Sequence, residues 1–313
     1  MNNDYATARD LYQQTDSDAD VLTDPEIAHL IVNHDKVLGM HGVPGLNIKT
    51  EQIEQGLNIE IDLESQHKIN KPVHLCFGML PERGTQRIEM KVNIGDNSSI
   101  AILAHCVFPR AIKVKHIMNA EILIGENAVY SYQEKHVHSD SGGVEVIPKA
   151  KIVVGKNSRF STEFVLLKGR VGIIDVDYAA EGLEYSVIDM NARISGLQDD
   201  VIKINEQAYL NGEHSTAVLT SKIAVRDRAR AQINNKIVAS APYARGHVDC
   251  KEIVQDQGVA NAVPIVEVAH PKAHVTHEAA IGSVDNKQLE TLMSRGISED
   301  EAVEMIIQGL LSK

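Results

Sequence analysis

One turn motif recurs in this chain at a constant interval. An apolar segment followed by glycine, a charged residue and asparagine occurs three times, and its glycines, Gly95, Gly125 and Gly155, are each 30 residues apart. A strand and turn repeated at a fixed spacing are typical of a solenoid, in which each coil stacks on the one before it. Gly and Asn readily adopt the positive φ that a corner requires. The alternative is a β-sandwich whose periodicity is coincidental.

The region from about residue 72 to 270 has the hydrophobic pattern of strands. Ile88, Met90, Val92 and Ile94 alternate with polar residues, which indicates strands buried on one face. Aromatic residues make up 4% of the chain and Trp is absent, so aliphatic side chains must fill the interior. The same alternation continues with small or aliphatic residues at Ile202, Ile204, Ile223, Val225, Ala229, Ala231 and Ile233.

The first 70 residues are expected to be helical and irregular. Asp24-Pro25 has the composition of a helix start, because Asp accepts the free N–H groups of the first turn and Pro has the required φ. Leu30 and Ile31 follow at helical spacing, and Gly39 offers a stop.

The last 30 residues are predicted to form a helical hairpin. Asp285 with Gln288, and Ser298 with Glu301, resemble capping boxes, and Gly296 lies between them as a C-cap. The chain is thus divided into residues 1–70, 71–282 and 283–313. The hairpin has apolar stripes that would pack on the solenoid or dock a partner: Leu289, Leu292, Met293, Val303, Ile306 and Leu310.

Charge and composition exclude several classes of protein. The 31 Lys and Arg against 43 Asp and Glu give a net charge of −12, which disfavours a nucleic-acid binder. Three Cys form no disulfide framework, no secretory leader pattern precedes the fold, and no apolar run is long enough to span a bilayer, so we expect a cytoplasmic protein.

Motifs of the common enzyme classes are missing as well. The sequence contains no phosphate-binding loop, dinucleotide-binding loop or nucleophile elbow. His277-Glu278 begins like a zinc-protease helix, but Ile281 stands where the second histidine is needed.

Soft and borderline metal ligands gather toward the C-terminal end of the strand region. His247, Asp249, Cys250, His277 and Glu278 fall close together in sequence, with His270 and His274 between them. Thiolate, imidazole and carboxylate ligands together suit iron, zinc or an iron–sulfur cluster. Cys250 has polar neighbours, which favours a functional role.

Further candidates lie upstream in three short motifs. His74 with Cys76, the adjacent pair His105-Cys106, and His136 with His138 offer ligands, and residues two apart share one face of a strand. Cys76 and Cys106 also fit as small buried hydrophobes, and His136 and His138 as a solvated strand face. Three Cys cannot complete a four-thiolate cluster in one chain, so other ligands or a second chain must contribute.

The C-terminal motifs resemble the SufB/SufD family of iron–sulfur cluster assembly proteins. The similarity lies in Ala244-Arg-Gly-His-Val-Asp-Cys250, Val263-Pro264 with Glu267, His277-Glu-Ala-Ala-Ile-Gly-Ser283 and the segment from Gln288 to Gly309, and it is specific over about residues 170–313. His74-x-Cys76 and His105-Cys106 look like the short archaeal-type members. The resemblance implies a right-handed parallel β-helix with helical N- and C-terminal segments, a dimer, and a C-terminal region that docks a SufC-type ABC ATPase.

The resemblance also implies a set of cluster ligands. Glu278 matches the family's Glu after His, and His277 matches the histidine of SufD-like members. The cysteine position falls on Asp249 without a gap and on Cys250 after a shift of one residue. The implied set is Cys250, His277 and Glu278, with Cys106, Cys76, Asp249 and His247 as further candidates.

Three functions follow as hypotheses. The first is a scaffold without catalytic activity of its own, a homodimer that holds a transient iron–sulfur cluster at its interface. The second is a structural subunit of an ABC-type ATPase complex with no cluster. The third is a metal-dependent solenoid enzyme acting on carbohydrate, which rests on fold analogy alone.

Overall fold

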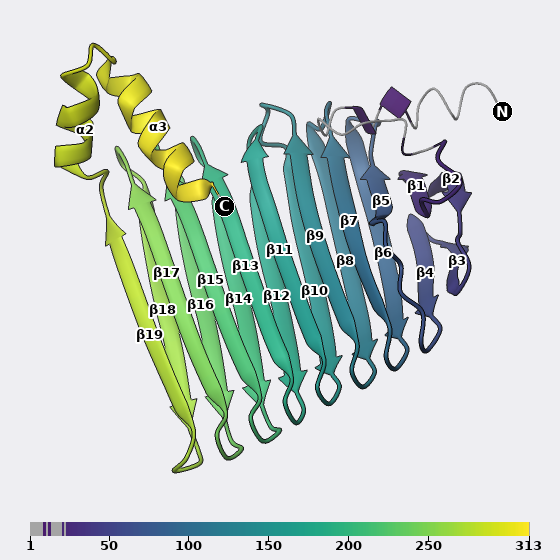
Figure 1. Cartoon of the computed structure of the whole chain (residues 1–313). Helices are drawn as coiled ribbons and strands as arrows, with labels where there is room; N and C mark the ends of the chain where they lie inside the picture. Colours follow the sequence, from purple (N-terminus) through teal and green to yellow (C-terminus); the bar gives the residue numbers. More distant parts are fainter. Residues whose placement is uncertain (1–8, 11, 14–20, 22, 313) are drawn as a thin grey trace.

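A computed structural model describes residues 9–10, 12–13, 21 and 23–312, and in this part of the chain two β-sheets face each other (Figure 1). Sheet A has ten strands, in the order β19-β17-β15-β13-β11-β9-β7-β5-β1-β2, and sheet B has nine, in the order β18-β16-β14-β12-β10-β8-β6-β4-β3. Sheet A comprises β1 (His29–Asn33), β2 (Lys36–His41), β5 (Val73–Gly78), β7 (Ser99–Phe108), β9 (Val129–His138), β11 (Arg159–Lys168), β13 (Val187–Gly196), β15 (Thr216–Val225), β17 (Arg245–Val254) and β19 (His274–Gly282). Sheet B comprises β3 (Leu46–Ile53), β4 (Gly56–Leu63), β6 (Arg83–Ile94), β8 (Lys113–Ile124), β10 (Val144–Val154), β12 (Ile173–Gly182), β14 (Val201–Leu210), β16 (Arg230–Ala239) and β18 (Val259–Val268).

The strands form a parallel β-solenoid. From β4 onward the chain alternates between the sheets, so that each coil adds one strand to sheet B and one to sheet A, for about eight turns. Equivalent residues stack 30 apart in the row Lys91, Glu121 and Lys151, and 28 or 29 apart in later coils, as in Ile173, Val201 and Arg230. The parallel register excludes the sandwich and confirms the solenoid predicted from the repeat.

The corners confirm one part of the turn prediction and correct another. Asn97, Asn127 and Asn157 have φ values of 56°, 53° and 56°, in the left-handed region. The preceding glycines do not have positive φ. A Cβ atom on Gly155 would lie 2.5 Å from the carbonyl oxygen of Gly125. Glycine is therefore required there because the backbones of successive coils approach closely.

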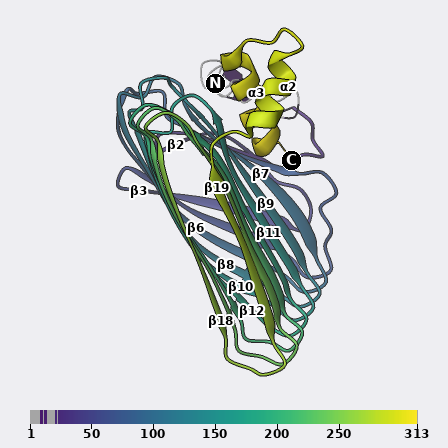
Figure 2. The same ribbon diagram turned by 90° about the vertical axis from the view of Figure 1, so that its left-hand side faces the viewer.

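The core runs along the inside of the coils and is mostly aliphatic. Inward residues such as Ile122, Ile152 and Ile204 are at most 5% exposed and belong to one continuous cluster between the sheets. Figure 2, seen from the β18–β19 end, shows the two sheets as two layers with this interior between them. The aliphatic interior expected from the low aromatic content is confirmed.

The helix expected after Asp24-Pro25 is wrong. The Asp24 carboxylate does accept a hydrogen bond from the backbone N–H of Glu26 at 2.8 Å, but the chain then enters β1, which pairs antiparallel with β2 and parallel with β5. Both faces of β1 are buried, since Leu30 packs into the interior and Ile31 against the outer cluster around Cys76. Long-range strand pairing outweighs the local helical pattern. Residues 1–8, 11, 14–20 and 22 lie outside the described residues, and the division of the chain at residues 70 and 282 stays a prediction.

The C-terminal helix pair is confirmed. Helix α2 spans Asn286–Met293 and α3 spans Glu299–Leu311. The carboxylate of Asp285 accepts from the N–H of Gln288, and Ser298 with Glu301 forms a complete capping box. Helix α3 contacts β13 and β15, where Ile307 and Leu311 are buried against Ala224.

Candidate functional site

The ligands predicted near the C-terminal end divide between two faces of sheet A. On β17, Cys250 points into the solenoid and is fully buried, whereas Asp249 and His247 point outward. On β19, Glu278 is the register partner of Asp249, and His277 is the partner of the inward-facing Val248. The outward group is therefore His247, Asp249 and Glu278, and the inward group is Cys250 and His277.

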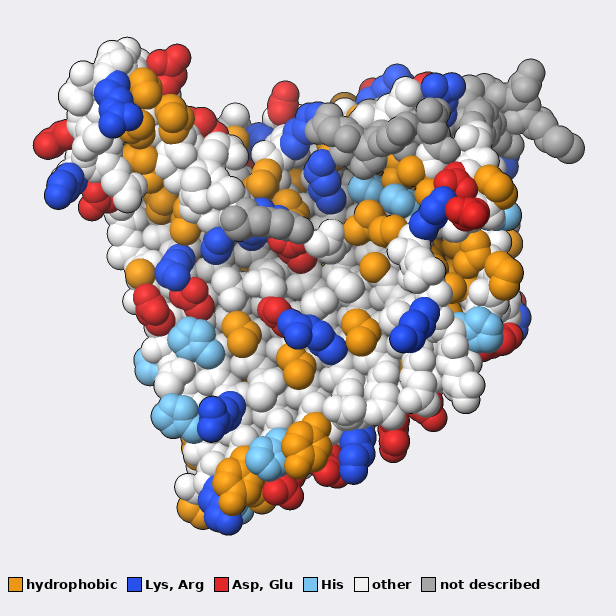
Figure 3. Space-filling view, viewed as in Figure 1, with side chains coloured by type: hydrophobic (Ala, Val, Ile, Leu, Met, Phe, Trp, Pro, Cys, Tyr) orange, Lys and Arg blue, Asp and Glu red, His pale blue; other side chains and the backbone are white. Residues whose placement is uncertain are grey.

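The outward group is polar and already has partners. The ammonium of Lys251 lies 2.9 Å from one carboxylate oxygen of Asp249, while the other oxygen is buried without a hydrogen bond. The Nδ1 atom of His247 lies 2.8 Å from the hydroxyl of Thr276 on β19. Histidine side chains are visible at this end of sheet A in Figure 3. These side chains form a shallow acidic and imidazole surface beside an exposed strand.

Cys250 lies in a partly polar pocket of the interior. The Nδ2 atom of Asn235 is 3.8 Å from its Sγ, and Ser221 donates to the carboxylate of the neighbouring Glu252 at 3.2 Å. Burial raises the pKa of the Cys250 thiol, and hydrogen bonds from Ser221 and Asn235 offset part of that increase. Burial likewise raises the pKa of Glu252 to about 7.

The last coil is open at the end of the solenoid. Strands β18 and β19 are the terminal strands of their sheets, so one backbone edge of each has no neighbouring strand among the described residues. Their side chains are largely exposed, including Val263 at 37% and Ile265 at 41%. Unpaired edges with exposed apolar residues are a template for pairing with another chain. This end of the solenoid therefore has open backbone edges and exposed apolar side chains together.

Cys76 and Cys106 lie on adjacent strands but on opposite faces of sheet A, and Cys250 lies far from both. Cys76 on β5 points to the outer side of sheet A, where it packs with Tyr12, Ile31 and Val107. Cys106 points into the solenoid like Cys250, but β7 and β17 are five strand positions apart in sheet A. At about 4.8 Å per strand, this is roughly 24 Å. No pair of the cysteines can bind one metal ion within a single chain.

Cys106 belongs to a buried polar cluster inside the N-terminal half of the solenoid. Its Sγ lies 3.7 Å from the carboxylate of Glu134 and 3.9 Å from Nε2 of His116. The same carboxylate oxygen lies 2.7 Å from Nε2 of His136, and Nδ1 of His136 lies 3.1 Å from Nε2 of His138. Cys106, Glu134 and His136 each offer a ligand atom, and these atoms lie within 4.8 Å of one another.

Burial and neighbouring charges shift the pKa values of the residues in this cluster. Burial raises the pKa of Glu134, but the hydrogen bond and charge of His136 and the charge of His116 more than offset this, so the pKa is lowered. Burial and the charge of Glu134 hold the pKa of the Cys106 thiol well above its usual range. Burial lowers the pKa of His116 to about 3. The carboxylate is thus the resident negative charge, and the thiol is neutral.

Sequence reasoning missed Glu134 and His116 in this cluster. It treated His136 and His138 as a chelating pair or a solvated face, and both are buried, at 1% and 4% exposure. The signal was available in the alternation, because Tyr130, Tyr132, Glu134, His136 and His138 share one face of β9 and that face is the interior.

A second upstream group covers the outer side of sheet A near its N-terminal end. The hydroxyl of Tyr12 lies 2.5 Å from Nδ1 of His74, and the rings of His74 and His105 are stacked at 6.2 Å. Burial lowers the pKa of His105 to about 4, with charges of His74 and Lys135 adding to it. Burial raises the pKa of Cys76 beneath them to about 12. These residues form a separate group from Cys106.

A groove of about 1080 Å³ lies between the helix pair and the upper ends of β17 and β19. Of the six apolar residues predicted to meet a partner, Leu292, Ile306 and Leu310 line it, together with Met305. Leu289, Val303 and Ile306 pack toward the solenoid, and Met293 is 41% exposed. Some residues of the apolar stripes therefore pack against the solenoid, and others line the groove or are exposed.

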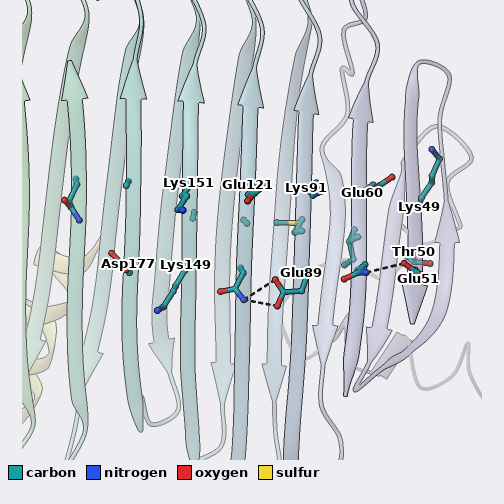
Figure 4. Close-up of a pocket in the computed structure, with 18 residues that line it drawn as sticks. Lys49, Thr50, Glu51, Glu60, Glu89, Lys91, Glu121, Lys149, Lys151 and Asp177 are labelled. Carbon is teal, nitrogen blue, oxygen red and sulfur yellow. Dashed lines mark hydrogen bonds between the residues drawn. The ribbon is translucent and has the colours of Figure 1, made fainter. Parts of the chain in front are cut away.

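The outer face of sheet B carries a charged depression of about 950 Å³ (Figure 4). Rows of stacked residues alternate in charge, as in Glu60, Lys91, Glu121 and Lys151. Neighbouring coils are joined by hydrogen bonds such as those from the Asn119 amide to both oxygens of Glu89, at 2.9 and 3.1 Å. This face is balanced in charge and contains none of the predicted ligands.

The fold and these groups define a parallel β-solenoid protein with clustered cysteine, histidine and carboxylate side chains and a C-terminal helix pair. Residues 81–310 match the family described as the SUF system FeS cluster assembly SufBD core domain. The chain is 37% identical over 291 residues to an iron-sulfur cluster assembly SufBD family protein of Methanocaldococcus jannaschii, covering 91% of this chain and 92% of that one. It is 35% identical over 310 residues to one of Pyrococcus horikoshii, covering 99% and 94%. The chain therefore belongs to the SufBD family, which confirms the resemblance and places it in iron–sulfur cluster assembly.

Similarity to one longer member is confined to a short part of the chain. The Bacillus subtilis iron-sulfur cluster assembly protein SufB is 38% identical over 72 residues, which cover 23% of this chain and 16% of SufB. Among the described residues, neither helix is long or apolar enough to cross a membrane.

Proposed function

We propose that the chain is a scaffold component of an iron–sulfur cluster assembly complex, and that two copies hold a nascent cluster where the open ends of their solenoids meet. The main observation behind this proposal is the open last coil, formed by β18 and β19. Its unpaired edges and exposed Val263 and Ile265 need a partner surface, and a second copy offers the same surface related by a two-fold axis. The cluster is cargo, bound transiently and released.

The ligand groups support a shared site. His247, Asp249 and Glu278 lie on the outer face beside the open end, and His277 is exposed on the terminal strand. Cys250 is one strand further in and fully buried. In a dimer, each chain contributes one such group of ligands. Together the two groups supply the cluster ligands that the three separated cysteines of one chain cannot provide. A set rich in imidazole and carboxylate binds a cluster less tightly than four thiolates, as release requires.

The helix pair supports a SufC-type ABC ATPase as the partner that drives the complex. The sequence has no nucleotide-binding loop of its own, and the groove lined by Leu292, Met305 and Leu310 is an apolar surface at the end of the molecule. ATP hydrolysis would take place in that partner, so this chain performs no catalysis. A complex that handles free thiols and reduced iron belongs in the cytoplasm.

Anaerobic reconstitution tests the scaffold. Wild-type protein treated with Fe²⁺ and sulfide should develop visible absorption, and Cys250→Ser and Glu278→Gln should each reduce it several-fold. Cys76→Ser is the matched control, because Cys76 lies on the opposite side of sheet A and far from β19. Full colour in both variants would remove these residues from the ligand set.

Light scattering tests the dimer. Val263→Asp places a charge on the exposed terminal strand and should shift the protein from dimer to monomer. Val218→Asp, 40% exposed on β15, is the control. A wild-type protein that is monomeric at micromolar concentration would contradict the shared site.

A second function is favoured by the burial of Cys250. A fully buried thiol with a raised pKa is a poor cluster ligand, which fits a structural subunit of an ABC-type ATPase complex without a cluster. Iron and acid-labile sulfide in the anaerobically isolated complex distinguish the two functions.

A further inference from the structure

The cluster around Cys106 lies outside the scaffold site proposed above and stands on its own observations. Along most of the described coils the interior is mainly aliphatic. Here a thiol, a carboxylate and three imidazoles point into it: Cys106 from β7, His116 from β8, and Glu134, His136 and His138 from β9. Burying a polar atom without a hydrogen bond is unfavourable, and one of these atoms, Nδ1 of His116, has none.

The solenoid register brings the ligands together. Cys106 and His136 are direct partners on β7 and β9, so their side chains point the same way from adjacent strands. Glu134 precedes His136 by two residues and shares its face. His116 reaches the same point from sheet B, with its Nε2 atom 3.9 Å from the Cys106 Sγ. The ligand atoms of Cys106, Glu134 and His136 thus meet at one point of the interior, and His116 approaches it from sheet B through its contact with Cys106.

The hydrogen bonds fix the orientation of His136. Nδ1 of His138 lies 3.0 Å from the carbonyl oxygen of Arg170, and because a carbonyl only accepts, this nitrogen carries the proton. In neutral His138 the other nitrogen is then an acceptor, and it faces Nδ1 of His136 at 3.1 Å. His136 therefore donates from Nδ1 and turns Nε2 toward Glu134. A metal-binding histidine is held in this way, with its second nitrogen donating to a fixed acceptor.

Nε2 of His136 then has two possible occupants, a proton shared with Glu134 or a metal ion. The distances suit the ion. With a metal–sulfur bond of about 2.3 Å and metal–nitrogen or metal–oxygen bonds of about 2.0 Å, tetrahedral geometry puts sulfur roughly 3.5 Å from the other donors. The observed 3.7 Å and 3.9 Å are close to this, and the 2.7 Å between Glu134 and His136 would widen by about half an ångström.

Charge balance also suits a divalent ion. A thiolate and a carboxylate carry two negative charges, and two neutral imidazoles add none, so an M²⁺ ion makes the buried group neutral. A neutral group avoids the desolvation cost of a net charge. Without metal, the same neutrality requires a thiol and a proton on His136. Binding one ion therefore displaces two protons.

We propose that Cys106, Glu134 and His136, with His116 at the fourth position, form a resident site for one divalent transition-metal ion of the zinc type, inside the solenoid and separate from the cluster cargo. Four protein ligands without an open position are typical of a structural site. His138 is a positioning residue, because it contacts His136 and not the ion. The mixed sulfur, nitrogen and oxygen ligands suit Zn²⁺ first and Fe²⁺ second.

Metal analysis of the full chain tests the site. Because the ligands are fully buried, the protein is refolded under reducing, anaerobic conditions with Zn²⁺, Co²⁺ or Fe²⁺ and then freed of excess metal. Wild-type protein should retain one ion per chain and gain thermal stability. With Co²⁺ it should show an absorption band from the thiolate–cobalt bond. The Zn²⁺ and Fe²⁺ samples decide which ion is held more tightly.

Variants separate metal binding from folding. Cys106→Ser should lose the cobalt band and the metal-dependent gain in melting temperature, while Cys76→Ser and Cys250→Ser keep both. Glu134→Gln preserves the side-chain volume and should lower retention at least ten-fold. His138→Phe should weaken affinity ten- to a hundred-fold while the thiolate band remains. Variants that melt like metal-free wild type show that the losses concern the ion.

Two results would overturn the site. One is a folded wild-type protein that retains none of the three metals after refolding, in which case Glu134 and His136 share a proton. The other is a cobalt band that persists in Cys106→Ser. Neither result depends on a cluster at the open end, so this site and the scaffold function can fail separately.

Discussion

Arg170, in the corner between β11 and β12, forms a buried ion pair with Asp200, in the corner between β13 and β14 of the next coil, and Nη2 of Arg170 lies 2.7 Å from the carboxylate of Asp200. Asp200 is fully buried and also accepts from the backbone N–H groups of Val171, Gly172 and Leu197, at 3.1, 3.0 and 2.9 Å. The carbonyl of Arg170 accepts from His138. The Asp200 side chain thus holds two successive coils together, and the backbone of its partner Arg170 borders the Cys106 cluster.

Replacing Asp200 with Ala should lower the free energy of unfolding by about 3 kcal/mol, because a buried cation and three N–H groups lose their partner. The neighbouring Asp199 also contacts Arg170, but its side chain is 75% exposed. Asp199→Ala should therefore change stability by less than about 1 kcal/mol. Urea unfolding of both variants measures the difference, and equal effects would show that the corner does not depend on burial.

Substitution of Gly155 should destabilise the protein more than substitution of a glycine that has open space around it. Gly155→Ala puts a methyl group about 2.5 Å from the carbonyl oxygens of Ile124 and Gly125, so the coils must separate, at a cost of about 2 kcal/mol. Gly282→Ala is the control, since nothing lies within 4 Å of the added atom. Thermal melting should separate the two. Similar melting temperatures would mean that the coils can move apart freely.

The repeat was predictable because it is local. The interval between Gly95 and Gly125 reports one complete coil, and the same stacking places Asn97 over Asn127. Strands β1 and β2 were not predictable in this way, because β1 forms through pairing with β5, whose partner residues lie 45 positions later, as in His29 and His74. The apolar residues of β1 pack into two different clusters, on opposite faces of the strand. Successive residues are therefore all apolar, and the alternation typical of a strand is missing.

The candidate site was predictable only in part, for a related reason. Residue types identified Cys106, Cys250 and Glu278, but not which side chains share a face. In a strand, Asp249 and Cys250 necessarily point to opposite sides, and which side is interior depends on the phase of the whole coil. The same phase brings Glu134 into the core, where a carboxylate is not expected from its type alone.

A substitution in the small cluster beneath α3 should destabilise the helix pair without unfolding the solenoid. Ile307 is fully buried in a small cluster with Ala224, Val284 and Leu311, so Ile307→Ala should cost about 2–3 kcal/mol in local stability. Because the cluster is separate from the main core, hydrogen exchange in α3 should accelerate while β13 and β15 stay protected. Met305→Ala, 51% exposed, should leave exchange unchanged. Loss of protection in the strands as well would make the helices part of the solenoid's cooperative unit.

Glu206 should make stability depend on pH. It is 1% exposed on β14, its Oε2 atom has no hydrogen bond, and burial, with the charge of Asp189 adding to it, raises its pKa from 4.5 to about 8. Between these values the unfolded chain has lost the proton and the folded chain keeps it. The free energy of unfolding therefore falls by at most about 5 kcal/mol as pH rises from about 4.5 to about 8. Above pH 8 this contribution no longer changes.

Glu206→Gln tests this dependence, because the amide is nearly isosteric and carries no charge at any pH. The variant should match wild type near pH 4.5 and be more stable than wild type at pH 8, with a smaller slope between them. The slope will not vanish, since Glu252, with a pKa of about 7, contributes in the same direction. Glu126→Gln at an exposed corner is the control. Urea unfolding across this pH range gives the slopes, and parallel curves for wild type and Glu206→Gln would show that Glu206 is ionised in the folded protein.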